Sequence, residues 1–99
     1  MARLDVFPNP GGVGYLLDVQ ADLLEELNTR VVVPLLPKNV APKPIGRLNP
    51  VFTIGVTEYV MATQLLAAIP RRALGTAVTN LGPHHSRIVE ALDMLITGV

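Results

Sequence analysis

Five short segments of the chain carry strand patterns, with alternating hydrophobic and polar residues or runs of β-branched residues. Proline and glycine residues separate them, as is typical of turns. The segments are residues 4–7, 15–20, 30–33, 51–54 and 57–61. The apolar run at 30–33 is typical of a strand buried on both faces. The short break at Gly55-Val56 predicts a β-hairpin, so the chain as a whole predicts a mainly antiparallel sheet.

Residues 61–69 carry two conflicting patterns. Their Met, Ala, Gln and Leu content favours a helix. However, the segment continues a predicted strand, its odd positions form a largely apolar row, and it ends at Pro70. We therefore expect one long strand here.

Two connections between the strands carry signals of their own. Residues 37–50 contain four prolines, with Pro34 just before them, which excludes a central strand or a helix and predicts an ordered surface excursion. Asp22 is placed to cap a short helical turn that runs to Leu27.

The last part of the chain changes to a helical period after the break at Gly82-Pro83, and Ser86 is placed to cap this helix. At about 100° per residue, apolar side chains fall within one arc and polar ones on the opposite side. The arc contains Ile88, Val89, Ala91, Leu92, Leu95, Ile96 and Val99, and the polar side contains Ser86, Glu90, Asp93 and Thr97. We expect the arc to pack on the core and the polar face to meet solvent or a partner.

Composition narrows the class of protein. The 99 residues are 49% hydrophobic and only 16% charged, which indicates apolar surface that a second copy of the chain would cover. Eight basic and eight acidic residues cancel, which disfavours broad electrostatic binding to nucleic acid or to an anionic membrane. There is no cysteine, no signal-peptide pattern and no apolar run of membrane-spanning length. We expect one soluble, cytoplasmic domain over residues 1–99.

Candidate chemistry is sparse. Gly12-x-Gly14 precedes a strand rather than a helix, which favours a hairpin turn over a phosphate loop. His84-His85 would point about 100° apart on a helix and lack a third ligand, so solvent exposure is favoured over metal or acid–base work. Arg71-Arg72 could hold an anion, but such a pair in a turn is more often simply solvated. We expect no enzyme, cofactor or metal, and the pattern indicates binding to another protein.

Three parts of the chain match one known family in residues and spacing. They are Tyr15–Leu24 followed by Arg30–Leu35, then Asn49–Gly55 with Met61–Thr63, and finally Ala91–Val99. These segments resemble CcdB, a family of toxins from bacterial type II toxin–antitoxin systems. The resemblance runs nearly end to end. It implies an α+β fold in which a small barrel-like antiparallel sheet carries a C-terminal helix, a fold shared with the MazF ribonucleases. It also implies a symmetric homodimer and a strand at residues 61–69.

The resemblance implies a function without catalysis. CcdB toxins insert the paired C-terminal helices of their dimer into the DNA gyrase A-subunit dimer and trap gyrase with cleaved DNA. A small cognate antitoxin neutralises the toxin, and the pair represses its own operon, so operator DNA is bound only together with the antitoxin. By position, the implied gyrase-binding residues are Asp93, Ile96, Thr97, Gly98 and Val99, with Leu23 and Leu24 near the antitoxin or gyrase surface.

The chain departs from the family at this end. Thr97-Gly98-Val99 stands where the best-known members carry Trp-Gly-Ile, and Asp93 replaces an asparagine. The family's tryptophan stacks on a gyrase arginine, so Thr97 forfeits a cation–π contact of about 0.5–2 kcal/mol. Three functions stay open: a gyrase-directed toxin, a non-toxic or retargeted homologue, and a MazF-like endoribonuclease. For the endoribonuclease, the candidate residues are Arg71, Arg72 and His84.

Overall fold

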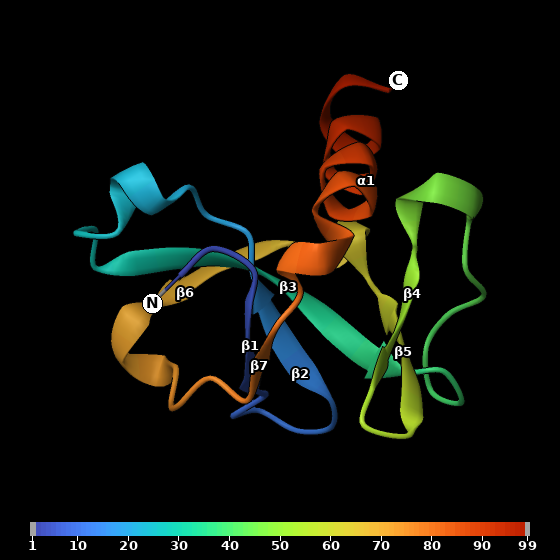
Figure 1. The fold of residues 1–99 in the computed structure, drawn as a ribbon, viewed down its shortest axis with the longest axis horizontal. Helices are drawn as coiled ribbons and strands as arrows, with labels where there is room; N and C mark the ends of the chain where they lie inside the picture. The colour runs from blue at the N-terminus through green and yellow to red at the C-terminus, as the bar shows by residue number, and fades with distance from the viewer. Residues whose placement is uncertain (1, 99) are drawn as a thin grey trace.

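In the described part of the chain, seven strands form one antiparallel sheet, and a single α-helix stands against it (Figure 1). The computed structural model describes residues 2–98. The strands are β1 (Asp5–Pro8), β2 (Tyr15–Asp18), β3 (Thr29–Pro37), β4 (Val51–Ile54), β5 (Thr57–Met61), β6 (Ala67–Pro70) and β7 (Thr79–Asn80), and the helix is α1 (His85–Thr97). Short 3-10 helices connect them: η1 (Asp22–Leu24), η2 (Gly46–Leu48), η3 (Thr63–Leu65), η4 (Arg71–Ala73) and η5 (Gly82–His84). The expected α+β class is confirmed. Within the described residues, no helix has the length and apolar character needed to cross a membrane.

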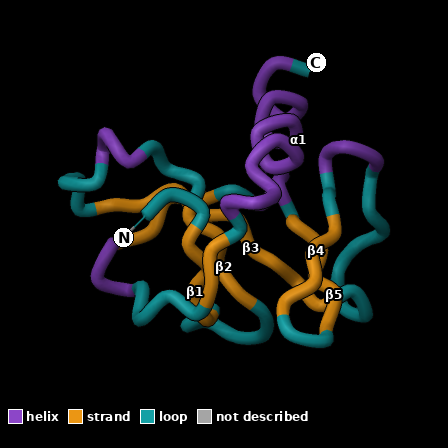
Figure 2. The backbone as a smooth tube through the Cα atoms, in the orientation of Figure 1, coloured by secondary structure: helices purple, strands orange, loops and turns teal. Residues whose placement is uncertain are grey.

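The centre of the sheet is β3, which pairs along both of its edges. One edge pairs with β2, and the other pairs with β5 at one end and β6 at the other. The strand order is β4-β5-β3-β2-β1-β7, with β6 off this path. The sheet curls into a half-barrel, so that the β1–β2 and β4–β5 hairpins stand apart with α1 above and between them (Figure 2). The predicted hairpin of β4 and β5 is confirmed with its expected bounds.

The long strand expected over residues 61–69 is wrong, because η3 interrupts it. β5 ends at Met61, and β6 then resumes pairing with the same edge of β3. Between these two pairings the register shifts by three residues, which equals the length of η3. Thr63 is fully buried, and its hydroxyl donates to the carbonyl of Leu48 at 2.5 Å. This bond ties the interruption to the surface excursion that precedes β4.

Several other strand and helix boundaries differ by a few residues from those that the sequence pattern predicts. β2 ends at Asp18 rather than at residue 20, and β3 extends to Pro37 because its last three residues pair with β5. The helical turn expected to run to Leu27 is only the three-residue η1, and Ala21 rather than Asp22 occupies its N-cap. The proline-rich excursion is confirmed, since η2 is the one regular element between β3 and β4 in the described chain.

Apolar side chains fill both faces of the sheet, because neighbouring residues of a strand point to opposite sides. Leu17 and Val33 belong to the larger cluster beneath α1, whereas their neighbours Leu16 and Val32 belong to a second cluster. The larger cluster contains Leu4, Val6, Leu17, Val19, Val33, Leu35, Phe52, Met61, Leu81, Ile88 and Ala91. The second contains Phe7, Leu16, Val32 and Leu74. This arrangement confirms that the apolar run in β3 reflects burial on both faces.

The helix α1 packs on the core as far as Leu92, but its last turn does not. Of the expected apolar arc, Ile88 and Ala91 are fully buried, but Ile96 is 73% exposed. The prediction that the whole arc packs on the core is therefore wrong, because the helix projects beyond the sheet (Figure 1). The expected cap is also wrong: η5 leads directly into α1, His84 occupies the N-cap, and no side chain caps it. Gly98 ends the helix in the left-handed region at φ +77°, where glycine is favoured.

Candidate functional site

The first candidate surface is the connection between β2 and β3, which we call the leucine loop (residues 21–28). Every residue of this loop is exposed. Leu23 is 93% exposed, Leu24 47% and Leu27 49%. Three leucines in contact with water over so short a segment are typical of a protein-binding surface. The loop contains Leu23 and Leu24, the two residues that the family resemblance implies lie near an antitoxin or gyrase surface.

A buried ion pair closes the base of the leucine loop. Asp18 ends β2 and Arg30 follows the start of β3, and both side chains are completely buried. Arg30 Nε and Nη2 donate to the same oxygen, Asp18 Oδ2, at 2.9 and 2.6 Å. The backbone N–H of Gln20 donates to the other carboxylate oxygen at 3.0 Å. Arg30 Nη1 has no hydrogen-bond partner among the described residues.

Burial dominates the electrostatics of this pair. Removal from water raises the pKa of the Asp18 carboxyl above its usual 3.8, and the hydrogen bonds from Arg30 and from the Gln20 N–H offset only part of that rise. The pair is therefore structural, since it is inaccessible to any ligand. The sequence offered a signal for it, because antiparallel pairing places Asp18 opposite Val32 and Arg30 lies two residues away on the same face.

The second candidate surface is the projecting end of α1. Ile96 is exposed there, and so are Asp93, Thr97 and Gly98. The hydroxyl of Thr97 donates to the carbonyl of Asp93 at 2.6 Å, so this side chain bonds within the helix. Val99 lies outside the described residues. Both this helix end and η1 of the leucine loop lie on the upper side of the fold in Figure 1.

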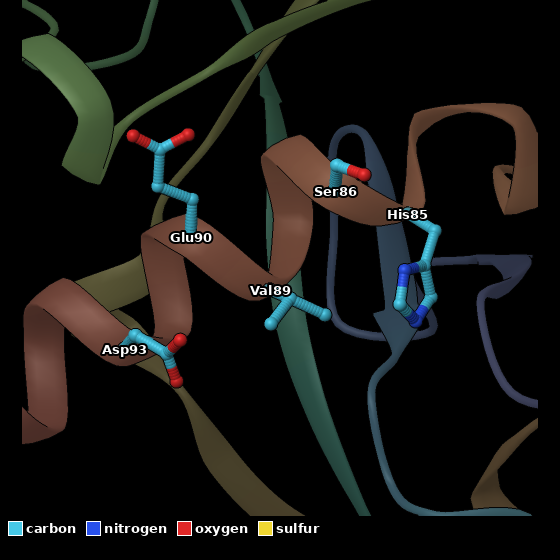
Figure 3. Close-up of a pocket in the computed structure, with 5 residues that line it drawn as sticks. All are labelled: His85, Ser86, Val89, Glu90 and Asp93. Atoms are coloured by element: carbon cyan, nitrogen blue, oxygen red, sulfur yellow. The ribbon is translucent and has the colours of Figure 1, made fainter.

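A groove of about 300 Å³ runs along one side of α1. Its lining side chains come from successive turns of the helix (Figure 3) and are His85, Ser86, Val89, Glu90 and Asp93. Glu90 forms an exposed ion pair with Arg47 at 3.1 Å. Asp93 contributes a second carboxylate to the wall of the groove.

Arg3 links the groove to the leucine loop. Its Nη1 lies 3.4 Å from Nε2 of His85 at the start of α1. Its backbone N–H donates to Asp22 Oδ1 at 2.7 Å, and its Nε donates to the carbonyl of Val19 at 3.2 Å. Arg3 therefore connects the start of α1 to the start of the leucine loop, through its side chain at His85 and through its backbone at Asp22. No sequence pattern indicates these contacts, because Arg3 and His85 are far apart along the chain.

The remaining candidates for chemistry are not brought together. The ring of His84 packs against Phe52 with centroids 5.0 Å apart, beneath α1. Arg71 lies in η4, and its guanidinium donates to the carbonyl of Glu25. Arg72 is exposed beside it. η4 and η5 occupy different parts of the fold (Figure 1), so these residues do not form one site.

The Gly12-x-Gly14 segment is confirmed as the turn between the antiparallel strands β1 and β2. Gly14 has φ +86°, and a Cβ at this position would collide with the carbonyl of Leu35. The glycine is required for close backbone approach and for the left-handed conformation. No helix follows it within the described chain until η1, so the segment does not have the structure of a phosphate loop.

Comparison with known proteins identifies the family. Two solved structures from Mycobacterial species are similar in fold. One is an endoribonuclease in complex with its cognate antitoxin, with a TM-score of 0.80 and 18% identity over 98% of this chain and 95% of that one. The other is an endoribonuclease with a TM-score of 0.78 and 16% identity over 98% of this chain and 91% of that one. Identities this low establish a shared fold only. The family model described as CcdB protein matches residues 3–98, and the chain therefore belongs to the CcdB family of toxin–antitoxin toxins.

Proposed function

We propose that this chain is a type II toxin that binds the DNA gyrase A subunit through the end of α1 and traps gyrase with cleaved DNA. One observation carries the proposal: Ile96 is 73% exposed on the last turn of a helix that projects beyond the sheet. Burying a side chain of this size contributes roughly 1.5–3 kcal/mol. A helix end that held no partner would gain nothing from an apolar residue at this position.

The leucine loop supplies a second apolar contact on the same side of the fold. Leu23 and Leu24 would extend the surface that Ile96 begins, and Asp93 adds one negative charge beside it. The interaction requires only exclusion of water and matching shape, so no catalytic group, cofactor or metal takes part. Thr97 offers no aromatic ring, so binding rests more heavily on these apolar residues.

The proposal includes a homodimer, which would bring two α1 ends together at a single gyrase surface. Exposed apolar residues near η3 and β6 favour self-association: Leu65 is 51% exposed, and Ala67 and Ala68 are exposed beside it. A cognate antitoxin would cover the leucine loop and the helix end, and the complex of both proteins would bind operator DNA and repress the operon.

Inducible expression in bacteria tests the proposal. The full chain is expected to arrest growth, and a gyrase A-subunit mutation is expected to relieve the arrest. Ile96→Ser and removal of residues 97–99 should both abolish toxicity. Val56→Ser is the matched control, because Val56 is 101% exposed in the β4–β5 turn and lies away from the helix end. If the truncated chain is as toxic as the full one, the end of α1 is not the gyrase contact.

Two alternative functions are each favoured by one observation. Thr97 in place of tryptophan favours a non-toxic or retargeted homologue, which would still fold and bind an antitoxin but would not arrest growth through gyrase. The fold shared with two endoribonucleases favours RNA cleavage. Incubating purified protein with RNA separates this alternative, and the zero net charge of the chain disfavours it.

A further inference from the structure

The leucine loop follows a defined course although its leucines contact solvent rather than the core. Backbone hydrogen bonds run from Leu24 to Ala21, from Glu25 to Asp22 and from Leu27 to Leu24, at 2.9–3.1 Å. Each such bond contributes only about 0.5–1.5 kcal/mol net, because water competes for the same groups. Groups outside the loop must therefore contribute to its shape.

Two side chains outside the loop bind its backbone carbonyls. Gln20 Nε2 donates to the carbonyl of Leu24 at 3.0 Å, and its Oε1 accepts the N–H of Val31 at 3.0 Å, so it connects the loop to β3. Arg71 reaches the loop from η4, and its Nη1 donates to the carbonyl of Glu25 at 2.5 Å. A charged donor makes the stronger bond of the two.

We propose that Arg71 is a positioning residue, whose guanidinium holds the leucine loop in the shape that Leu23 and Leu24 need to contact a partner protein. The backbone N–H of Arg71 also donates to the carbonyl of Asn28 at 2.8 Å, which fixes η4 against the end of the loop. A loop held in advance loses less conformational entropy when it binds. The identity of the partner rests on the proposed gyrase function, but the holding of the loop does not.

Arg72 provides the matched control. It follows Arg71 in η4, carries the same charge, is exposed, and makes no side-chain hydrogen bond within the described residues. Arg71→Ala, Arg72→Ala and Arg71→Lys are compared with the unaltered full chain. Hydrogen–deuterium exchange of the free protein is measured first. In Arg71→Ala, the amides of Leu24 and Glu25 should exchange about tenfold faster, the factor expected for loss of a charged hydrogen bond.

The exchange of the amides in β3 and the melting temperature of Arg71→Ala should match those of Arg72→Ala. Arg71→Lys should restore most of the slow exchange, because lysine retains a charged donor. Binding to purified DNA gyrase A subunit is measured next. Arg71→Ala should bind about tenfold more weakly than Arg72→Ala at an equal melting temperature, a pattern that general loss of stability would not give.

Two results would overturn the inference. The first is a rate of amide exchange in the leucine loop that is the same in Arg71→Ala as in Arg72→Ala. The other is faster exchange with no change in gyrase affinity, because the bond to Glu25 would then not serve binding. If the unaltered chain does not bind gyrase, the proposed function fails, and the exchange measurement alone decides whether Arg71 holds the loop.

Discussion

Single and double substitutions in the buried pair of Asp18 and Arg30 should differ in their effect on the free energy of unfolding. Replacing one residue leaves a buried charge without its partner, whereas replacing both leaves no buried charge. Both side chains are 0% exposed, and both short hydrogen bonds reach a single carboxylate oxygen. Arg30→Met leaves the carboxylate with one backbone donor, the N–H of Gln20. Breaking a buried pair by removing one partner costs about 3–5 kcal/mol. A domain of this size has a free energy of unfolding of roughly 5–15 kcal/mol, so this single change should remove about a fifth or more of it.

Replacing both partners should cost far less. Asp18→Val combined with Arg30→Met leaves no buried charge, and such replacements are commonly neutral or stabilising by about 1–4 kcal/mol. Arg30 Nη1 has no partner in the described chain, so part of the desolvation cost of the native pair is uncompensated. Urea unfolding at pH 7, followed by circular dichroism, measures both variants. With a slope of about 1–3 kcal/mol per M, the midpoint of Arg30→Met should fall by at least 1 M.

The pH dependence supplies an independent check. Burial raises the pKa of Asp18 above 3.8 in the folded chain. The protonated Asp18 carboxyl therefore favours the folded state below pH 3.8, and this contribution to stability is lost as the pH rises through the pKa that Asp18 has in the folded chain. In Arg30→Met the lowering influence of Arg30 is lost, and the pKa rises further. The variant should therefore recover stability relative to the unaltered chain as the pH falls from 7 to 5. A loss below about 1 kcal/mol at pH 7, or a loss that is independent of pH, would refute the reasoning.

Three further predictions concern single positions. Gly14→Ala should destabilise the fold by about 1–3 kcal/mol, because φ at this position is +86° and the new methyl group would collide with the carbonyl of Leu35. Gly75→Ala is the control and should change the melting temperature little, so equal melting temperatures of the two variants would contradict the prediction. Thr63→Val should cost about 1–3 kcal/mol in urea unfolding, because the partly buried carbonyl of Leu48 loses its donor, and a neutral result would show that this bond is dispensable. Thr97→Trp should tighten gyrase binding by about twofold to thirtyfold in calorimetry, and unchanged or weaker affinity would contradict the cation–π argument.

Local patterns predicted the elements that local interactions determine. The hairpin of β4 and β5 was predicted with its bounds, because strand residues and turn residues adjoin each other there. The same reasoning failed at Thr63, because the bond that interrupts the strand reaches Leu48, fifteen residues earlier. The hydrophobic pattern shows which residues are apolar, but it does not indicate that a polar side chain is buried because it bonds to a residue far away in the sequence.

The sequence pattern likewise predicted only part of the candidate site. The helical period placed Asp93 and Thr97 on the exposed side, as observed. It placed Ile96 with the core residues, because a helical wheel carries no information about where the sheet beneath a helix ends. The resemblance to the CcdB family was the source for Ile96, Leu23 and Leu24 as binding residues, and their roles stay predictions.

The leucine loop reverses the usual division of a protein into apolar interior and polar surface. Its base is a buried ion pair, and its backbone is held by the polar side chains of Gln20 and Arg71. Its apolar side chains, led by Leu23 at 93% exposure, meet water. Polar residues in place of the leucines would serve the fold of the free chain at least as well, because exposed leucines add no core contacts. Leucines held in this way would become favourable once a second surface covered them, which is what the proposed binding function supplies.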